Sequence, residues 1–159
     1  MILAGALGAL ALFTLGFDVL IDQQRNPNQR PATLEAGDYV EVALEANRQD
    51  HYVANALING SEVEIMVDTG ATQVAISEGL ARRLSLPQGA AFTVSTANGT
   101  ARAYATRITS IRLGPIEMRD ISAAVVPNMS SPDVLLGMNF LRELELVQRE
   151  GRLVLRQYR

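Results

Sequence analysis

The chain has 159 residues, with 14 basic residues that are all Arg, 17 acidic residues, one histidine and a net charge of −3 at pH 7. It contains no cysteine and no lysine, which excludes disulfide scaffolds, thiol nucleophiles, thiolate zinc sites and Schiff-base chemistry, and a single His excludes a multi-histidine metal site. The length predicts one domain, and the acidic charge gives no reason to expect nucleic-acid binding. The remaining catalytic chemistry uses carboxylates or hydroxyl groups, and we expect neither a metal nor another cofactor.

The first segment, residues 1–21, is strongly apolar. Residues 1–17 are uncharged, and the apolar character resumes after Asp18. A helix of about 20 apolar residues spans the hydrocarbon core of a bilayer, so the segment predicts a single transmembrane anchor. A cleaved signal peptide is a weaker interpretation, because no basic residue precedes the run and its end lacks a small-residue cleavage site. A buried core helix is a third interpretation.

Residues 22–37 are polar and contain two prolines, which predicts a linker, with the folded domain over residues 38–159. Arg25 and Arg30 are the basic residues nearest to the apolar segment, and both follow it. By the positive-inside rule this arrangement favours a cytoplasmic domain.

From residue 38 onward the pattern is mostly that of β-strands. Alternating apolar residues predict a strand over 40–44, and apolar runs predict strands over 51–58 and 63–67. Asn59-Gly60 between two such runs predicts a tight hairpin, because both turn residues must adopt positive φ. Asn98-Gly99 predicts a second hairpin. Further strands are expected over 92–97, 100–113, 116–126, 134–136, 145–149 and 153–157, and the apolar character resumes over 74–76.

Two short stretches have a helical pattern. One covers residues 78–84 and begins after Ser77, a favourable N-cap residue, and the other covers residues 139–144. The sequence therefore predicts a mostly β domain with one or two short helices.

The stretch from Ile65 to Thr72 carries the chemistry. An apolar strand ends there in Asp68-Thr69-Gly70. Aspartate is unfavourable in strands and costly to bury, so this residue either forms a turn or is held there for its charge. An Asp-Thr-Gly tripeptide alone fits an ordinary turn. A second stretch, Val134 to Leu141, reads as an apolar strand, a glycine and a short helix.

Together these motifs resemble those of the retropepsin-like aspartic proteases, and the match runs from about Asn47 to Gln157. It is closest in pattern to the bacterial membrane-anchored members of that family. The motifs that carry it are His51-Tyr52-Val53, Ile58-Asn59-Gly60, Val67-Asp68-Thr69-Gly70-Ala71-Thr72, Thr96-Ala97-Asn98-Gly99 and Leu135-Leu136-Gly137-Met138-Asn139-Phe140-Leu141.

The resemblance implies a closed, barrel-like retropepsin fold and an aspartic endopeptidase that cuts extended peptides with apolar flanking side chains. It assigns the catalytic carboxylate to Asp68, a hydrogen bond across a dimer to Thr69, and close approach of substrate backbone to Gly70. It places substrate contacts at Ala71 and Thr72 and in a flap at Ala97, Asn98 and Gly99. It also implies that Leu135, Leu136 and Gly137 support the active-site loop.

Aspartic protease chemistry needs two carboxylates that share one proton, which favours acidic to mildly acidic pH. The sequence contains one Asp-Thr-Gly, so the second carboxylate has to come from a second copy. We therefore expect a homodimer in which Asp68 of each copy meets on the two-fold axis.

Two positions depart from the retroviral pattern. Retroviral members usually have Asp two residues after the motif glycine and Arg after the glycine of the second motif, and these two residues pair. This chain has Thr72 and Met138 at those positions. Both partners are missing together, so no unpaired charge results.

Two alternatives to proteolysis are open. One is a non-catalytic, membrane-tethered module for peptide binding or dimerisation, and the other is a purely structural β domain. For location, the resemblance implies a single-pass protein of the bacterial inner membrane with a periplasmic domain, against the count of Arg residues.

Overall fold

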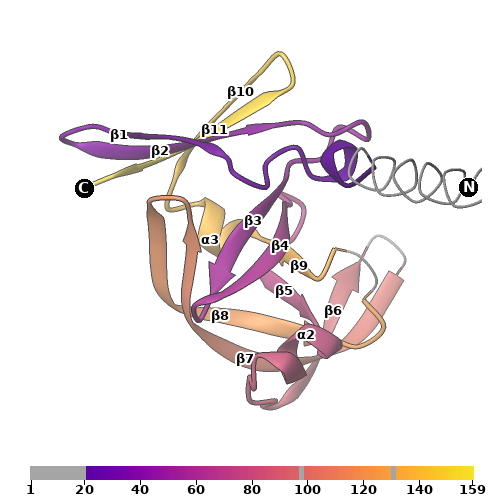
Figure 1. Ribbon diagram of the computed structural model, residues 1–159. Coiled ribbons are helices and arrows are strands. Elements are labelled where there is room, and N and C mark those ends of the chain that lie inside the picture. Colours follow the sequence, from indigo (N-terminus) through magenta and orange to yellow (C-terminus); the bar gives the residue numbers. More distant parts are fainter. Residues whose placement is uncertain (1–20, 97–98, 130–131) are drawn as a thin grey trace, which may run out of the picture.

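The computed structural model describes residues 21–96, 99–129 and 132–159, and within these residues the fold is mostly β, as predicted (Figure 1). The strands form two sheets, and the two short helices α2 and α3 lie in the segments predicted to be helical. The elements are β1 Ala32–Glu35, β2 Tyr39–Glu45, β3 Val53–Ile58, β4 Ser61–Val67, β5 Val74–Ser77, α2 Glu78–Arg83, β6 Ala91–Thr96, β7 Gly99–Leu113, β8 Ile116–Val126, β9 Val134–Leu136, α3 Met138–Leu141, β10 Glu145–Arg149 and β11 Arg152–Tyr158.

The larger sheet closes on itself. Its strand order is β3-β4-β9-β5-β8-β7-β6, and β3 also pairs with β7 through Leu57 and Ile58. This additional pairing brings the first strand of the sheet against the long β7 strand, which gives the barrel-like body in the lower half of Figure 1.

The Asn59-Gly60 turn joins β3 to β4 with φ of 51° and 82°, which confirms the predicted hairpin. In the second hairpin, between β6 and β7, Gly99 has φ of 108°, while Ala97 and Asn98 lie outside the described residues. Ser77 caps α2 as predicted, because its Oγ accepts a hydrogen bond from the Leu80 backbone N–H at 3.2 Å.

The smaller sheet, in the order β1-β2-β11-β10, lies across one end of the body (Figure 1). Val42, Leu44 and Leu155 are fully buried. The turn between β7 and β8 reaches this sheet at Gly114, where a Cβ atom would lie 2.9 Å from Thr33 Cγ2 and 3.0 Å from Val42 Cγ2. Gly114 also has φ of +56°, so glycine permits both the turn and the close approach of body and sheet.

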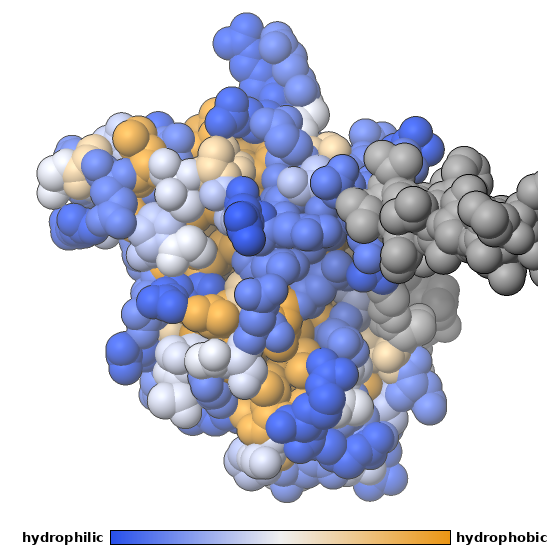
Figure 2. Space-filling model, viewed as in Figure 1, coloured by the Kyte–Doolittle hydropathy of each residue, from blue (hydrophilic) through white to orange (hydrophobic). Residues whose placement is uncertain are grey.

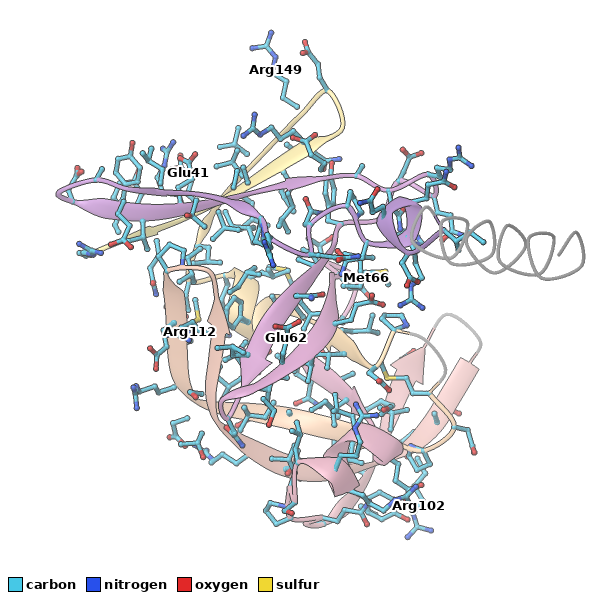
Figure 3. The ribbon with its side chains drawn as sticks, viewed as in Figure 1. Glu41, Glu62, Met66, Arg102, Arg112 and Arg149 are labelled. Carbon is cyan, nitrogen blue, oxygen red and sulfur yellow. The ribbon has the colours of Figure 1, made fainter. Side chains whose placement is uncertain are left out.

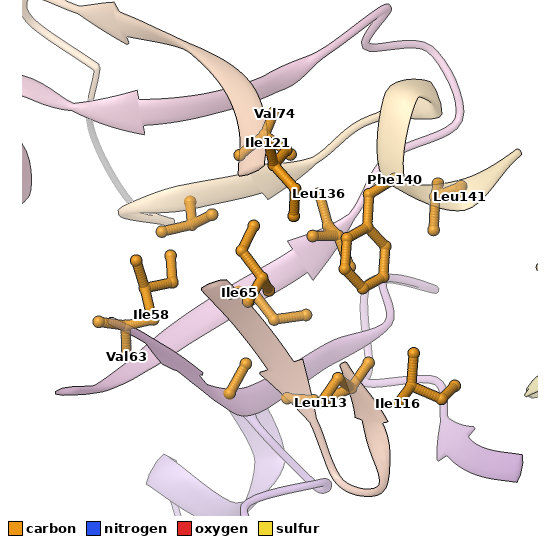
Figure 4. Packing of buried hydrophobic residues seen from close by; sticks show 14 of the residues in the cluster. Ile58, Val63, Ile65, Val74, Leu113, Ile116, Ile121, Leu136, Phe140 and Leu141 are labelled. Atoms are coloured by element: carbon orange, nitrogen blue, oxygen red, sulfur yellow. The ribbon is translucent and has the colours of Figure 1, made fainter. Parts of the chain in front are cut away.

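The core lies inside the closed sheet and continues beneath the smaller one. Figure 4 shows Phe140 pointing from α3 into this core, beside Leu136 and Ile65, and all three side chains are fully buried. The second sequence motif is therefore anchored by its apolar residues.

The N-terminal segment 22–37, predicted to be a linker, carries ordered structure. Strand β1 pairs antiparallel with β2, and Asn28 bridges to Ala54. The Asn28 Nδ2 group donates to the backbone oxygens of Glu45 at 2.9 Å and Val53 at 2.7 Å, and its Oδ1 accepts from the Glu45 N–H at 2.7 Å. The packed structure thus begins before Asp38, because a buried amide satisfies backbone groups on β2 and β3.

In the part of the chain that the structure describes, no helix is both long and apolar enough to cross a membrane. Apart from Ile21, the transmembrane anchor predicted over residues 1–21 lies outside that part. The anchor therefore stays a prediction.

Candidate active site

The loop that follows β4 is positioned by a strand from the other end of the chain. Strand β9 lies between β4 and β5, parallel to β4 with Val67 opposite Leu136, and antiparallel to β5 with Ala75 opposite Leu135. The connection from β4 to β5 therefore has to pass over the end of β9. Asp68, Thr69 and Gly70 lie in that connection.

Asp68 is fixed by two hydrogen bonds. Its backbone N–H donates to the Leu136 carbonyl oxygen at 3.1 Å, and its Oδ1 accepts from the Gly70 N–H at 2.8 Å. The first bond ties the loop to β9, and the second orients the carboxylate. Asp68 is half-buried, whereas Thr69 and Gly70 are exposed. Water, substrate or a second copy of the loop can therefore reach this carboxylate.

Gly137 allows the second motif to touch the Asp68 loop. A Cβ atom at this position would lie 2.3 Å from the Gln73 carbonyl oxygen and 2.9 Å from that of Ala71, distances that no real side chain tolerates. The next residue, Met138, donates its N–H to the Ala71 oxygen at 2.8 Å. The structure thus brings Leu135, Leu136 and Gly137 against the predicted catalytic loop.

Asn139 is a contact residue that the sequence reasoning did not single out as part of the site. Its Oδ1 accepts from the Val74 N–H at 2.9 Å, its Nδ2 donates to the Ser122 oxygen at 2.7 Å, and its backbone N–H donates to the Thr72 oxygen at 3.2 Å. One side chain therefore joins α3 to β5 and β8. The signal in the sequence was a polar residue between the apolar Met138 and Phe140.

The predicted substrate-binding residues lie in two places. Ala71 and Thr72 follow Asp68 in the loop, and Thr72 is exposed. Gly99 begins β7 opposite Thr96, at the end of the β6–β7 hairpin, while Ala97 and Asn98 lie outside the described residues. No group of three or more His, Cys, Asp or Glu residues that could hold a metal ion occurs among the residues described.

Comparison with known proteins bears on this site and its fold. Residues 54–143 match the sequence model of the gag-polyprotein putative aspartyl protease family. An uncharacterised protein in the cobV 5′ region of Sinorhizobium sp. is 38% identical over 111 residues, which cover 68% of this chain and 48% of that protein. The chain thus spans about half the length of this curated relative.

Among solved structures, the crystal structure of a retropepsin-like aspartic protease from Rickettsia conorii matches with a TM-score of 0.62 and 23% sequence identity. The match covers 81% of this chain and 96% of that chain. This likeness confirms the expected fold class, and Asp68, Gly70 and Gly137 all lie within the segment that the family model covers.

Proposed function

The chain belongs to the gag-polyprotein putative aspartyl protease family, and from this premise we propose that it is an aspartic endopeptidase that works as a homodimer. In each copy the reacting group is the carboxylate of Asp68. Its substrates are extended peptide segments with apolar side chains on both sides of the bond that is cut.

The observation that carries this proposal is the geometry of the Asp68 loop. The bond from the Gly70 N–H to Asp68 Oδ1 is one that an ordinary turn also makes. The contact that goes beyond a local turn is the bond from the Asp68 backbone N–H to the Leu136 carbonyl oxygen of β9, which ties the Asp68 loop to the second motif. Half-burial leaves the carboxylate accessible while reducing its contact with bulk water. Such positioning is what general acid–base catalysis requires.

The chemistry follows from two such loops facing each other. Two carboxylates about 3 Å apart cannot both ionise, so they share a proton. The ionised carboxylate takes a proton from a water molecule, which attacks the peptide carbonyl carbon, and the protonated carboxylate donates its proton to the carbonyl oxygen. The carboxyl group that took the proton from water then gives it to the amide nitrogen, and the C–N bond breaks with release of the amine. The other carboxylate takes back a proton from a hydroxyl of the tetrahedral intermediate, which becomes the carboxylic acid product, and a new water molecule enters the site.

Each neighbour of Asp68 has a proposed part in this step. Thr69, which is exposed, would hydrogen-bond across the two-fold axis and hold the two loops together. Gly70 has no side chain to keep substrate backbone away. Gly99 and its hairpin neighbours would close over the substrate and exclude water.

The test is cleavage of a diverse peptide pool by the full chain in mild detergent, between pH 4 and pH 7.5. Wild type should cleave best below neutrality, and Asp68→Asn should lose activity by about a thousandfold or more, since one member of a coupled acid–base pair is lost. Asp38→Asn, which removes the same charge at an exposed position, is the control and should cleave normally.

Absence of cleavage by a verified wild-type dimer would contradict the proposal. Peptide binding without turnover would then favour the non-catalytic binding module. Activity that survives in Asp68→Asn would show that another group carries the reaction.

We also propose that residues 1–21 anchor the protein in the bacterial inner membrane, with the domain in the periplasm. The uncharged apolar run over residues 1–17 supports the anchor. Added protease should degrade the domain in spheroplasts that have an intact inner membrane. Protection of the domain would contradict the periplasmic location.

A further inference from the structure

His51, the one histidine of the chain, has no part in the mechanism proposed above, although it lies next to the Asp68 loop. Strand β3, which begins just after it, pairs antiparallel with β4. The Val67 N–H donates to the Tyr52 carbonyl oxygen at 2.9 Å, so these two residues are partners in the same register. One further step along this register brings His51 opposite Asp68.

The backbones of His51 and Asp68 are each bonded on the side that faces away from the other. The Asp68 N–H donates to the Leu136 oxygen on β9, and the backbone groups of His51 bond to Asn47. In antiparallel strands, opposite residues without mutual backbone bonds have Cα atoms only about 4.5 Å apart, and their side chains are close. The His51 side chain therefore starts beside the carboxylate to which the proposed function assigns the reaction.

A buried amide fixes the backbone of His51. Asn47, which is 9% exposed, accepts at Oδ1 from the His51 N–H at 3.0 Å and from the Gln49 N–H at 2.9 Å. The Asn47 N–H donates to the His51 oxygen at 2.8 Å, and its Nδ2 donates to the Arg25 oxygen at 3.0 Å. This network holds His51 in place relative to β3 and to the N-terminal segment.

The imidazole ring itself is available to a bound molecule. His51 is exposed, whereas its neighbour Tyr52 belongs to the core. Within residues 21–96, 99–129 and 132–159, the ring makes no hydrogen bond or ion pair. A fixed backbone with an unused polar side chain is suited to binding a ligand group.

The start of β3 and the end of β4 lie at the same end of the body. Figure 3 shows Glu62 lower and Met66 higher on β4, and the register places Val53 beside Met66. In Figure 2, hydrophilic residues predominate on the surface between the smaller sheet and the body. A charged group of a bound peptide therefore meets a polar surface here.

The charges around His51 come from its own loop, from β4 with the loop that follows it, and from the N-terminal segment. They belong to Arg48, Asp50, Glu64, Asp68 and Arg25. Glu64 and Arg25 pair with each other at 3.1 Å, and Arg48 and Asp50 are both exposed. A carboxylate that a substrate brings to this place can therefore meet two cationic side chains, His51 and Arg48, and a test has to separate them.

The chemistry of the two partners fits the pH at which aspartic proteases work. Histidine side chains change charge between pH 5 and pH 8 and are positive at the acidic end of this range. Glutamate side chains are ionised above about pH 4.3. Between these limits an imidazolium and a substrate carboxylate attract each other, in the mildly acidic range that a shared proton also favours.

We propose that His51 is a specificity-determining residue that binds an acidic side chain of the substrate, close to the bond that is cut. Because the two copies are related by a two-fold axis, one such position lies on each side of the bond. This inference rests on the proposed function and adds a charged feature to its apolar-flanked substrate.

The test uses pairs of apolar-flanked peptides that differ only by Glu or Gln, at one position within three residues of the bond. The full chain in mild detergent cleaves them at pH 5.5 and at pH 7.5. At pH 5.5 wild type should prefer Glu about fivefold in kcat/KM, at one position on each side of the bond, as an exposed ion pair allows. At pH 7.5 the preference should be lost, because imidazole is then neutral.

Three variants assign the preference to one side chain. His51→Gln should bring the Glu to Gln ratio close to one at both pH values. His51→Arg should keep the preference at both, because a guanidinium group stays charged. Arg48→Gln, which removes an exposed charge from the same loop, is the matched control and should keep the wild-type ratio.

The outcomes separate this inference from the proposed function. Cleavage through Asp68 with equal rates for Glu and Gln peptides, or with a preference that survives in His51→Gln, overturns the inference and leaves the protease intact. So does a preference that Arg48→Gln abolishes, or an equal loss for both peptides of each pair in His51→Gln.

If wild type cleaves no peptide, the proposed function fails, and binding decides the inference. The same pairs, labelled with a fluorophore, are then titrated with wild type and with His51→Gln at pH 5.5, and anisotropy gives the dissociation constants. Tighter binding of Glu peptides by wild type alone supports the inference. Equal affinities, or no binding, overturn it.

Discussion

At the scale of single residues, Gly137 should be the least replaceable position beside the Asp68 loop. Gly137→Ala would force a methyl group to within 2.3 Å of the Gln73 carbonyl oxygen, so the backbone of one motif would have to shift. We expect a loss of about 1 to 3 kcal/mol of unfolding free energy, as overpacking typically causes, together with reduced cleavage. Urea denaturation followed by circular dichroism measures the first quantity.

Gly79→Ala is the control for this change. Gly79 lies in α2 with nothing within 4 Å of the added methyl group, and alanine favours helix over glycine by about 0.5 to 1 kcal/mol. This variant should therefore be slightly stabilised. Equal stability of both variants would contradict the close approach at Gly137.

Asn139 should act on the site through the backbone that it holds. Asn139→Ala removes both side-chain bonds, to Val74 and Ser122, and should lower the unfolding free energy by about 1 to 2 kcal/mol. Asn139→Asp keeps the acceptor for the Val74 N–H but places a charged carboxylate oxygen against the Ser122 carbonyl oxygen, so at neutral pH it should be destabilised more than Asn139→Ala. The ordering of the two unfolding midpoints checks this, and the opposite ordering would contradict the assigned contacts.

The Asp68 motif could be singled out in the sequence because its pattern is local. Asp68-Thr69-Gly70 alone fits an ordinary turn, and it was the second motif at Leu135, together with the first, that indicated the family. The contacts of Asn139 could not be predicted in the same way, because they join three elements that only the folded chain brings together. The periodicity of apolar residues predicts helices and strands, but it does not predict a hydrogen bond from α3 to β8.

At the scale of elements, the Asn28 side chain should hold the N-terminal segment against the domain. Asn28→Ala would leave the Glu45 N–H and the Val53 carbonyl without this partner and should cost about 1 to 3 kcal/mol. Gln29→Ala, at an exposed neighbouring position, should change stability by less than about 0.5 kcal/mol. Hydrogen exchange of β1 amides should accelerate in the first variant alone.

The difference between predicted and observed elements has a physical reason. The hairpin at Asn59-Gly60 could be predicted because few residue pairs accept positive φ at both positions. Strand β1 could not, since its four residues are all exposed and show no alternation of buried and exposed positions. Its strand conformation comes from pairing with β2, a partner that its own sequence does not specify.

At the scale of the whole molecule, a site shared by two copies predicts a specific effect of mixing. When wild type and Asp68→Asn are equilibrated in equal amounts, a quarter of all dimers carry two Asp68 residues. The peptidase activity should then fall to about half that of the same wild-type amount alone. A monomeric enzyme would keep its full activity, so an unchanged rate after full exchange of copies would contradict the shared site.

The hydrogen bonds of Asn28 to β2 and β3 also limit how far the domain can move from residue 21. A free flexible segment the length of residues 22–37 would let its ends wander about 20 to 25 Å apart. Because residues 26–35 are bonded to the domain, this freedom is lost. The domain therefore stays close to residue 21 and cannot move far from it. If residues 1–21 anchor an active peptidase as proposed, it would reach only bonds presented close to the membrane, so location would select substrates before any side-chain pocket does.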